Sequence, residues 1–224
     1  MLAEPIHIAL PRYDRAERLL FESMAALFAQ ARDRDNDAGT ITDSRELEDI
    51  RRSQDGDSHA YRRLVEQHQP TVGKLLWRFT RDRNEHEELT QQVFVEAYMS
   101  LASYRAKAPF EHWLARIATR VGYRFWTANR RKEQSLPDEV WNRIAKPAAD
   151  APDSETASEL VHHLLAQLPP RDRLVLTLRY IQQCDIEQTA YRTGWTKTLV
   201  RVQTHRAINK LKKLAAKAQI ELEL

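Results

Sequence analysis

Basic and aromatic side chains share one face of the helix that is predicted from the apolar stripe between Phe110 and Val121. Four of them recur at helical spacing on that face: Arg116, Arg120, Tyr123 and Arg124. A further basic cluster, which contains Arg130 and Arg131, follows near the end of the same helix. Cationic side chains track a phosphate backbone and aromatic rings stack on unpaired bases. This combination is therefore typical of a surface that binds single-stranded nucleic acid.

A second set of exposed residues is predicted on a helix over residues 196–217. Arg201, Val202, His205 and Arg206 lie on its side away from the apolar residues. An arginine can form two parallel hydrogen bonds with the edge of a guanine, which discriminates against other bases by about 1–3 kcal/mol. The lysines of this helix, among them Lys197, suit phosphate contacts that position a duplex without reading it. An ordinary solvated helix end explains the lysines equally well.

Residue types that perform catalysis are present, but their spacing does not fit an active site. The run HEELT at 86–90 begins like a zinc-protease helix, yet Thr90 stands where the second histidine would have to be. The neighbours His162 and His163 point to different faces of a helix, and the five glycines form no phosphate-binding loop. We therefore expect no enzymatic activity, no bound metal and no cofactor.

Helices must position these surfaces, and the apolar residues recur with helical periodicity in the first half of the chain. One broad stripe runs from Phe110 to Val121, and a second from Leu89 to Leu101 in a helix that Asn84 is expected to cap. Pro70 is expected to interrupt the earlier helices. These residues predict a bundle of about four helices.

The C-terminal part has a different helical pattern. Pro169 and Pro170 suit the end of one helix and the first turn of the next. Asp185 is a good N-cap for a short helix that runs to Arg192, and Gly194 suits a left-handed residue that closes it. A short helix, a glycine turn and a longer basic helix form a helix-turn-helix. The whole chain therefore predicts an all-α fold with two small helical domains.

Charge divides the chain into four parts. The net charge from Lys, Arg, Asp and Glu is −5 over residues 1–50, +6 over 51–133, −3 over 134–158 and +5 over 159–224. Two basic blocks of this size are the electrostatic footprint expected of nucleic-acid binding. The acidic segment between them contains three prolines and predicts a flexible linker. The acidic N-terminal extension is predicted to include a helix over 13–32 that carries no recognisable chemistry.

The composition also bears on the compartment. Cys184 is the only cysteine, so no intramolecular disulfide can form, which fits a reducing environment. The chain has no apolar stretch of the roughly 18–20 residues that span a bilayer, and its N-terminus lacks a signal-peptide layout. We expect a cytoplasmic protein without membrane insertion.

At the level of motifs, the chain resembles the extracytoplasmic-function (ECF) sigma factors of the sigma-70 superfamily. The first block carries Ala60 to Val65, HEELTQQVF (86–94), FEHWLARIATR (110–120) and Asn129-Arg130-Arg131, which resemble the promoter-binding domain of that family. The second block carries LPPRDRLVLTLRY (168–180) and the helix-turn-helix with His205-Arg206-Ala207, which resemble its C-terminal domain. The resemblance implies a region 2 domain over 51–133 and a region 4 domain over 159–224.

The resemblance also implies three working surfaces. The first, which binds core RNA polymerase, consists of Glu88, Gln91, Gln92 and Val95. The second reads the minus-ten promoter element as opened strands and consists of Tyr104, Arg105, Lys107, Arg116, Arg120, Tyr123, Arg124, Arg130 and Arg131. The third reads the minus-thirty-five element as a duplex and consists of Lys197, Arg201, Val202, His205 and Arg206. Core polymerase, promoter DNA and an anti-sigma factor are the partners implied.

Several positions depart from the family pattern. Cys184, Thr189, Thr193 and Thr204 stand where the helix-turn-helix usually has Leu or Ile, and each leaves a polar atom that needs a partner. In addition, Gln182 and Gln183 replace the glycine that is usual before the short helix. We expect a less stable C-terminal domain with the same fold.

Two other classes of function compete with a sigma factor. A helix-turn-helix regulator that acts without polymerase explains residues 159–224 but leaves Glu88 to Val95 and the loop at 103–109 without a role. An adaptor with a sigma fold would work through protein contacts alone. Association with core polymerase and opening of fork-junction DNA distinguish the three classes.

Overall fold

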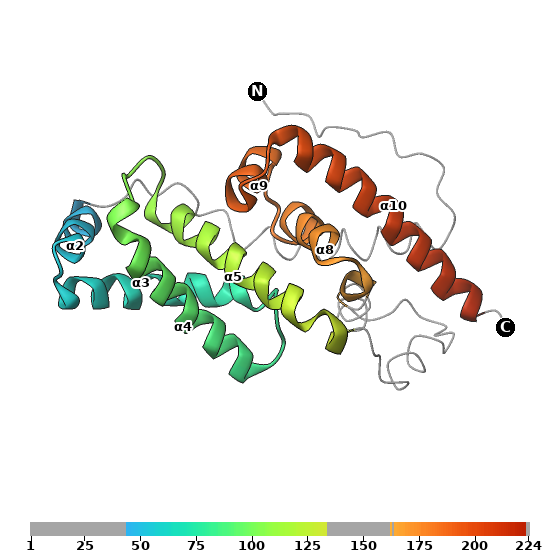
Figure 1. Ribbon diagram of the computed structural model, residues 1–224, viewed down its shortest axis with the longest axis horizontal. Helices are drawn as coiled ribbons and strands as arrows, with labels where there is room; N and C mark the ends of the chain where they lie inside the picture. The colour runs from blue at the N-terminus through green and yellow to red at the C-terminus, as the bar shows by residue number, and fades with distance from the viewer. Residues whose placement is uncertain (1–43, 134–161, 163, 223–224) are drawn as a thin grey trace, which may run out of the picture.

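The protein is described by a computed structural model over residues 44–133, 162 and 164–222 (Figure 1). All the regular structure in these residues is helical. The first domain contains α2 (Ser44–Gln54), α3 (Ser58–Leu76), α4 (Arg83–Ser100), the short 3-10 helix η1 (Leu101–Ser103) and α5 (Phe110–Glu133). The second contains α8 (Pro170–Leu176), the π-helical turn η2 (Thr177–Ile181), α9 (Ile186–Thr193) and α10 (Lys197–Leu222). The predicted all-α fold is confirmed. The helix expected over 13–32 and the predicted linker lie outside the described residues.

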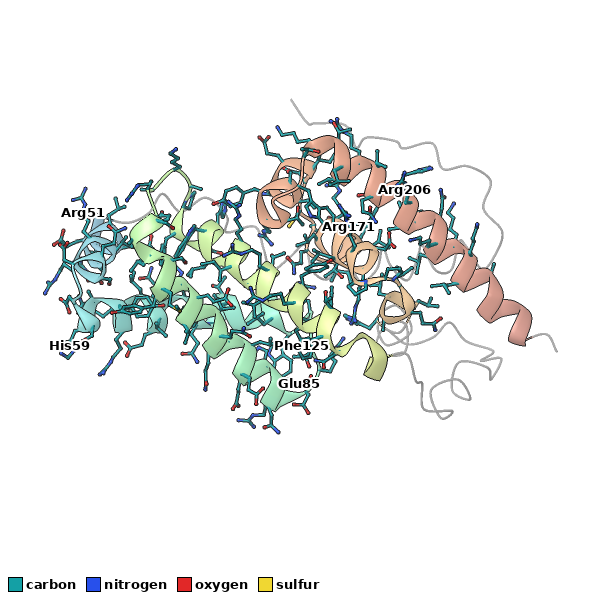
Figure 2. The ribbon with its side chains drawn as sticks, in the orientation of Figure 1. Arg51, His59, Glu85, Phe125, Arg171 and Arg206 are labelled. Atoms are coloured by element: carbon teal, nitrogen blue, oxygen red, sulfur yellow. The ribbon has the colours of Figure 1, made fainter. Side chains whose placement is uncertain are left out.

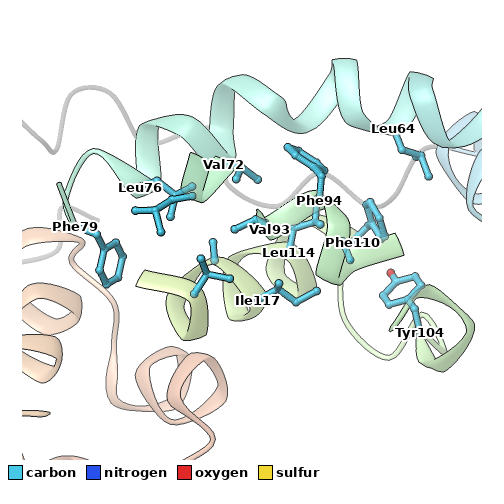
Figure 3. Packing of buried hydrophobic residues seen from close by; sticks show 14 of the residues in the cluster. Leu64, Val72, Leu76, Phe79, Val93, Phe94, Tyr104, Phe110, Leu114 and Ile117 are labelled. Carbon is cyan, nitrogen blue, oxygen red and sulfur yellow. The ribbon is translucent and has the colours of Figure 1, made fainter. Parts of the chain in front are cut away.

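In the first domain, α3, α4 and α5 pack around an apolar core (Figure 3). Leu64, Leu76, Phe110 and Ile117 are almost completely buried there. At one end of this core the Trp126 indole donates a hydrogen bond of 2.7 Å to the carbonyl oxygen of Phe79, and the two rings are 4.5 Å apart. This contact closes the core where α5 crosses the end of α3.

Two predicted helix boundaries are wrong. Helix α3 runs through Pro70 without interruption, because a proline removes only its own hydrogen bond while Val72 and Leu76 remain buried beyond it. Helix α4 is capped by Asp82 and not by Asn84: the Asp82 carboxylate accepts from the Glu85 amide at 2.9 Å. Both residue types cap well, so local sequence did not choose between them.

Helix α2 continues past residue 50, where the sequence suggested that an N-terminal extension ends, and packs against α3. Ile50 belongs to the core of the first domain. The buried Glu46 carboxylate lies 2.6 Å from the imidazole of buried His68, and Asp49 forms an ion pair with Arg63. These contacts make α2 part of the first domain.

The second domain has the predicted helix-turn-helix. Asp185 caps α9 in a capping box with Gln188, and Gly194 closes it with a φ of 75°. The buried Asp172 carboxylate of α8 accepts hydrogen bonds from Gln203 at 2.5 Å and from Lys210 at 2.6 Å, both on α10. This carboxylate therefore connects the first helix of the domain to the basic helix.

The unusual threonines of this domain all find partners. The hydroxyls of Thr189, Thr193 and Thr204 each donate to the carbonyl oxygen four residues earlier, at 2.7–2.8 Å. Because these bonds satisfy the polar atoms within the helix, the substitutions are compatible with the fold. The residue that takes the place of the usual glycine, Gln183, has a φ of 54°, in the left-handed region.

The two domains pack against each other, with α9 and α8 beside α5 (Figure 1). Leu174, Leu178 and Cys184 of the second domain join the core cluster of the first. Across the same contact, the Arg173 guanidinium lies over the Trp126 ring. Within the described residues, no helix combines the length and the apolar character needed to cross a membrane.

Candidate functional site

Helix α5 presents the predicted basic face toward solvent and toward the second domain. Arg116, Arg120 and Arg124 are exposed, and Tyr123 is partly buried. Arg116 lies 5.4 Å from the centroid of the Tyr191 ring on α9, and Arg124 forms an ion pair with Glu96 on α4. Arg130 and Arg131 fall within α5, but their side chains are outside the described part of the structure.

The loop before α5 differs from the sequence-based prediction at Tyr104. This side chain is buried, its ring packs against Phe110 and Trp113 at 5.3 Å, and its hydroxyl donates to the carbonyl oxygen of Ala108 at 2.7 Å. Tyr104 therefore supports the loop from inside and has no free ring face for a base. Arg105 and Lys107 are exposed beside it and remain candidates for DNA contact.

The backbone of this loop is held in a defined shape. Ala106 has a φ of 52°, a conformation that a residue with a Cβ adopts only at a cost. Arg105 donates from its guanidinium to the carbonyl oxygen of Ala102 at 2.9 Å, and Ser103 donates from its hydroxyl to that of Ser100 at 2.6 Å. Non-glycine residues with positive φ persist where surrounding contacts determine the backbone.

Helix α10 presents the predicted recognition set on its outer side. Arg201, Val202, His205 and Arg206 are all exposed, whereas Val200, Gln203, Ala207 and Leu211 are buried on the opposite side. Figure 2 labels Arg206 on the side of α10 away from α8. His205 is within 3.1 Å of the Asn209 amide, which orients its ring. The four residues of the set form a continuous patch on the outer surface.

The lysines of α10 have different surroundings. Lys197 contacts Glu187 of α9 at 2.8 Å, and both side chains are largely exposed, so this pair is weak and can exchange for a phosphate. Lys210, in contrast, contacts the buried Asp172 carboxylate at 2.6 Å. Lys210 therefore has a structural partner that the sequence did not predict.

Helix α4 presents the third predicted set. Glu88, Gln91, Gln92 and Val95 are exposed along one side, while Leu89 and Phe94 are buried in the core. Beyond Val95 the same exposed surface includes Tyr98 and Met99, of which Met99 is 79% exposed. Tyr98 and Met99 were not predicted from the sequence to be part of this surface. Both are large apolar or aromatic residues that lie outside the buried stripe from Leu89 to Leu101, and this position could have indicated a binding surface.

A cavity of about 330 Å³ lies where α5, α8 and α9 meet. Its lining includes Arg120 and Tyr123 of the first domain and Arg171, Arg192 and Trp195 of the second. Arg171 stacks on Trp195 at 4.8 Å, and Figure 2 labels it on α8. The cavity brings part of the α5 basic face close to the helix-turn-helix.

Two titratable groups at the contact between the domains have shifted pKa values. Burial lowers the pKa of His162 to about 4, and the positive charges of Arg81, Arg173 and Arg78 act in the same direction. Burial raises the pKa of the Cys184 thiol. Both groups are therefore kept uncharged, and neither has the environment of a reactive group.

The histidine of the HEELT run has structural contacts. The His86 ring stacks on the Trp77 ring, with the centroids 4.0 Å apart, and its Nε2 atom forms a hydrogen bond with the carbonyl oxygen of Gly73.

Comparison with known proteins identifies the family of both domains. Residues 64–132 match the family described as Sigma-70 region 2, and residues 158–211 match Sigma-70, region 4, so the two matches cover more than half of the chain. An ECF RNA polymerase sigma-E factor of Haemophilus influenzae is 30% identical over 151 residues, which cover 63% of this chain and 79% of the relative.

Two further similarities extend the comparison. An RNA polymerase sigma-H factor of Pseudomonas aeruginosa is 28% identical over 160 residues, with coverage of 67% and 83%. The solved structure of CnrH in complex with the cytosolic domain of CnrY has a TM-score of 0.51 at 20% identity, covers 78% of this chain and 99% of that chain, and supports the fold. The chain therefore belongs to the ECF family of sigma-70 factors, the proteins that direct RNA polymerase to promoters.

Proposed function

We propose that this sigma factor divides promoter recognition between its two domains. The first domain, over 44–133, docks on core polymerase and contacts the opened minus-ten element, and the domain over 159–224 reads the minus-thirty-five element as a duplex. The observation that carries the proposal is the placement of two exposed basic faces on different domains. The face on α5 combines arginines with Tyr123, and the face on α10 consists of Arg201, Val202, His205 and Arg206.

Each face suits the form of DNA assigned to it. The loop with the exposed Arg105 and Lys107 leads directly into α5, whose face combines arginines with the partly buried ring of Tyr123. Cations together with an aromatic ring suit single-stranded DNA. The long helix α10, with Arg201 and Arg206 on its outer side, suits the major groove of a duplex. The exposed side of α4 with Glu88, Gln91, Gln92 and Val95 is the proposed polymerase-binding surface.

The packing between the domains has a consequence for this mechanism. Tyr191 lies over Arg116, and Arg120 and Tyr123 line a cavity together with Trp195, so α9 occupies part of the path assigned to the opened strand. The domains must separate before the α5 face can bind DNA along its full length. Docking on polymerase, which holds two linked sites at a fixed spacing, supplies the free energy for that separation.

Assembly with core polymerase followed by run-off transcription on genomic fragments tests the proposal. We expect a stable complex and specific transcripts. Absence of a complex, with DNA binding retained, would favour a regulator that acts without polymerase. A complex without opening of fork-junction DNA would favour an adaptor with a sigma fold.

An anti-sigma factor is the further partner that we propose, and it would cover the α4 and α10 surfaces. The solved structure of CnrH, which has a similar fold, is a complex with a second polypeptide, the cytosolic domain of CnrY. We also propose that the chain is not an enzyme and acts in the cytoplasm, where core polymerase is located. Co-purification from cells that express the chain at its natural level would identify the partner.

A further inference from the structure

Helix α2, which sequence reasoning left without a role, contacts the loop that carries Arg105 and Lys107. The side-chain amide of Gln54, the last residue of α2, donates hydrogen bonds of 3.0 Å to the carbonyl oxygen of Leu101 and 3.1 Å to that of Tyr104. These acceptors are 47 and 50 residues away along the chain. One side chain therefore holds both ends of η1 at the point where the loop begins.

The geometry points to Gln54 as a positioning residue that sets the discrimination of the minus-ten element by the loop, an inference that rests on the proposed function. Tyr104 closes the far side of the loop through its bond to Ala108, and Gln54 fixes the near side from another helix. The left-handed Ala106 lies between these two attachments. Without Gln54, the backbone before Arg105 can relax and let Ala106 leave its unfavourable conformation.

Gln54 can act as an anchor because α2 is itself held in place. Ile50 is in the core, Glu46 contacts His68 in a buried pair, and Asp49 forms an ion pair with Arg63 of α3. Positions of recognition groups must be held within a fraction of an ångström for selective binding, and residues behind them provide this support. The support here runs from α3 through α2 to the loop.

A fork-junction DNA library, randomised across the minus-ten element, tests this inference with holoenzyme assembled from the full chain and core polymerase. The wild type is compared with Gln54→Met, which keeps the length of the side chain without its donors, and with Gln54→Lys, whose ammonium group can donate to both carbonyl oxygens. Arg51→Met is the matched control, because Arg51 is an exposed residue in the last turn of α2 (Figure 2).

We expect Gln54→Met to reduce the preference between favoured and disfavoured bases at the position read by the loop by about tenfold, the effect of losing two hydrogen bonds. Gln54→Lys should restore most of the preference, and Arg51→Met should leave it unchanged. Affinity for core polymerase and selection of a minus-thirty-five duplex should be equal in all four proteins. Wild-type selectivity in Gln54→Met, or a parallel loss of polymerase affinity, would overturn the inference.

A second variant separates loop positioning from general stability. Ala106→Gly removes the cost of the positive φ and frees the loop from within, so it should also reduce base preference while leaving the melting temperature unchanged or higher. The double variant with Gln54→Met should lose little more than either single variant, because both release the same loop. Additive losses would contradict a shared cause. If even the wild-type holoenzyme selects no sequence from the library, the proposed function of the first domain is wrong. A wild type that selects a sequence and a Gln54→Met variant that selects it equally well would contradict only the role of Gln54.

Discussion

The guanidinium carbon of Arg173 lies 3.9 Å from the centroid of the Trp126 ring, and the two residues belong to different domains. Arg173 is on α8 and is only 8% exposed, while Trp126 is on α5 and is 1% exposed. A cation over an aromatic ring away from water contributes about 2 kcal/mol. This contact, together with Leu174, Leu178 and Cys184, holds the helix-turn-helix domain against the α5 face in the free protein.

Loss of the Arg173 charge should therefore loosen the contact between the domains. In Arg173→Met, we expect alkylation of Cys184 by iodoacetamide to be about 30-fold faster than in the wild type, because a contact weakened by about 2 kcal/mol exposes this buried thiol more often. Lys213→Met is the control, since Lys213 is an exposed cation of α10 that does not line the contact between the domains. Equal rates in the wild type and Arg173→Met would show that Arg173 does not hold the domains together.

Low pH should weaken the folded state through His162. Its pKa is about 4 in the folded protein against an ordinary value of 6.5, so the folded state favours the neutral ring and the unfolded chain takes up the proton first. The stabilisation is complete above pH 6.5 and is lost as the pH falls toward 4, by about 2–3 kcal/mol. Thermal melting between pH 7 and pH 4 measures this change, and His162→Leu should lose most of the slope. A slope unchanged in that variant would assign the pH dependence to other groups.

Substitutions at Gln183 and Gly194, the two residues of the helix-turn-helix region with a positive φ, should have opposite effects on stability. Gly194→Ala should lower the free energy of unfolding by about 1 kcal/mol, since alanine is strained at a φ of 75°. Gln183→Gly should raise it by roughly 0.5 kcal/mol, because relief of strain at a φ of 54° exceeds the extra entropy of the unfolded chain. Urea denaturation checks both. A loss of stability in Gln183→Gly would mean that the Gln183 side chain contributes more than its backbone strain costs.

Variants on the two basic faces should affect different steps of initiation. Arg201→Ala or Arg206→Ala should weaken holoenzyme binding to a minus-thirty-five duplex by about 1–3 kcal/mol with strand opening retained on a pre-melted template. Arg120→Ala should leave duplex recognition intact and reduce opening, as followed by permanganate reactivity of unpaired thymines. Equal effects of both kinds of variant on duplex binding would contradict the division between the domains.

Much of this protein was determined by sequence patterns that act over a few residues. Helical periodicity, the Asp185 cap and the turn at Gly194 predicted the helix-turn-helix, since each depends on neighbours within one or two turns. The outward direction of Arg201, Val202, His205 and Arg206 followed from the same periodicity. The resemblance to ECF sigma factors rested on these local patterns and on their order.

Only the tertiary structure decided which long-range contacts each side chain makes. Tyr104 looked like a base-stacking residue, and Lys210 looked like a phosphate ligand, until the core beside the loop and the buried Asp172 were in place. The same is true of Gly122, where a methyl group would overlap the Phe79 ring, and of Gln54, whose acceptors come from another helix. Periodicity places a residue on one side of its own helix, but the packing of helices distant in sequence decides what meets that side.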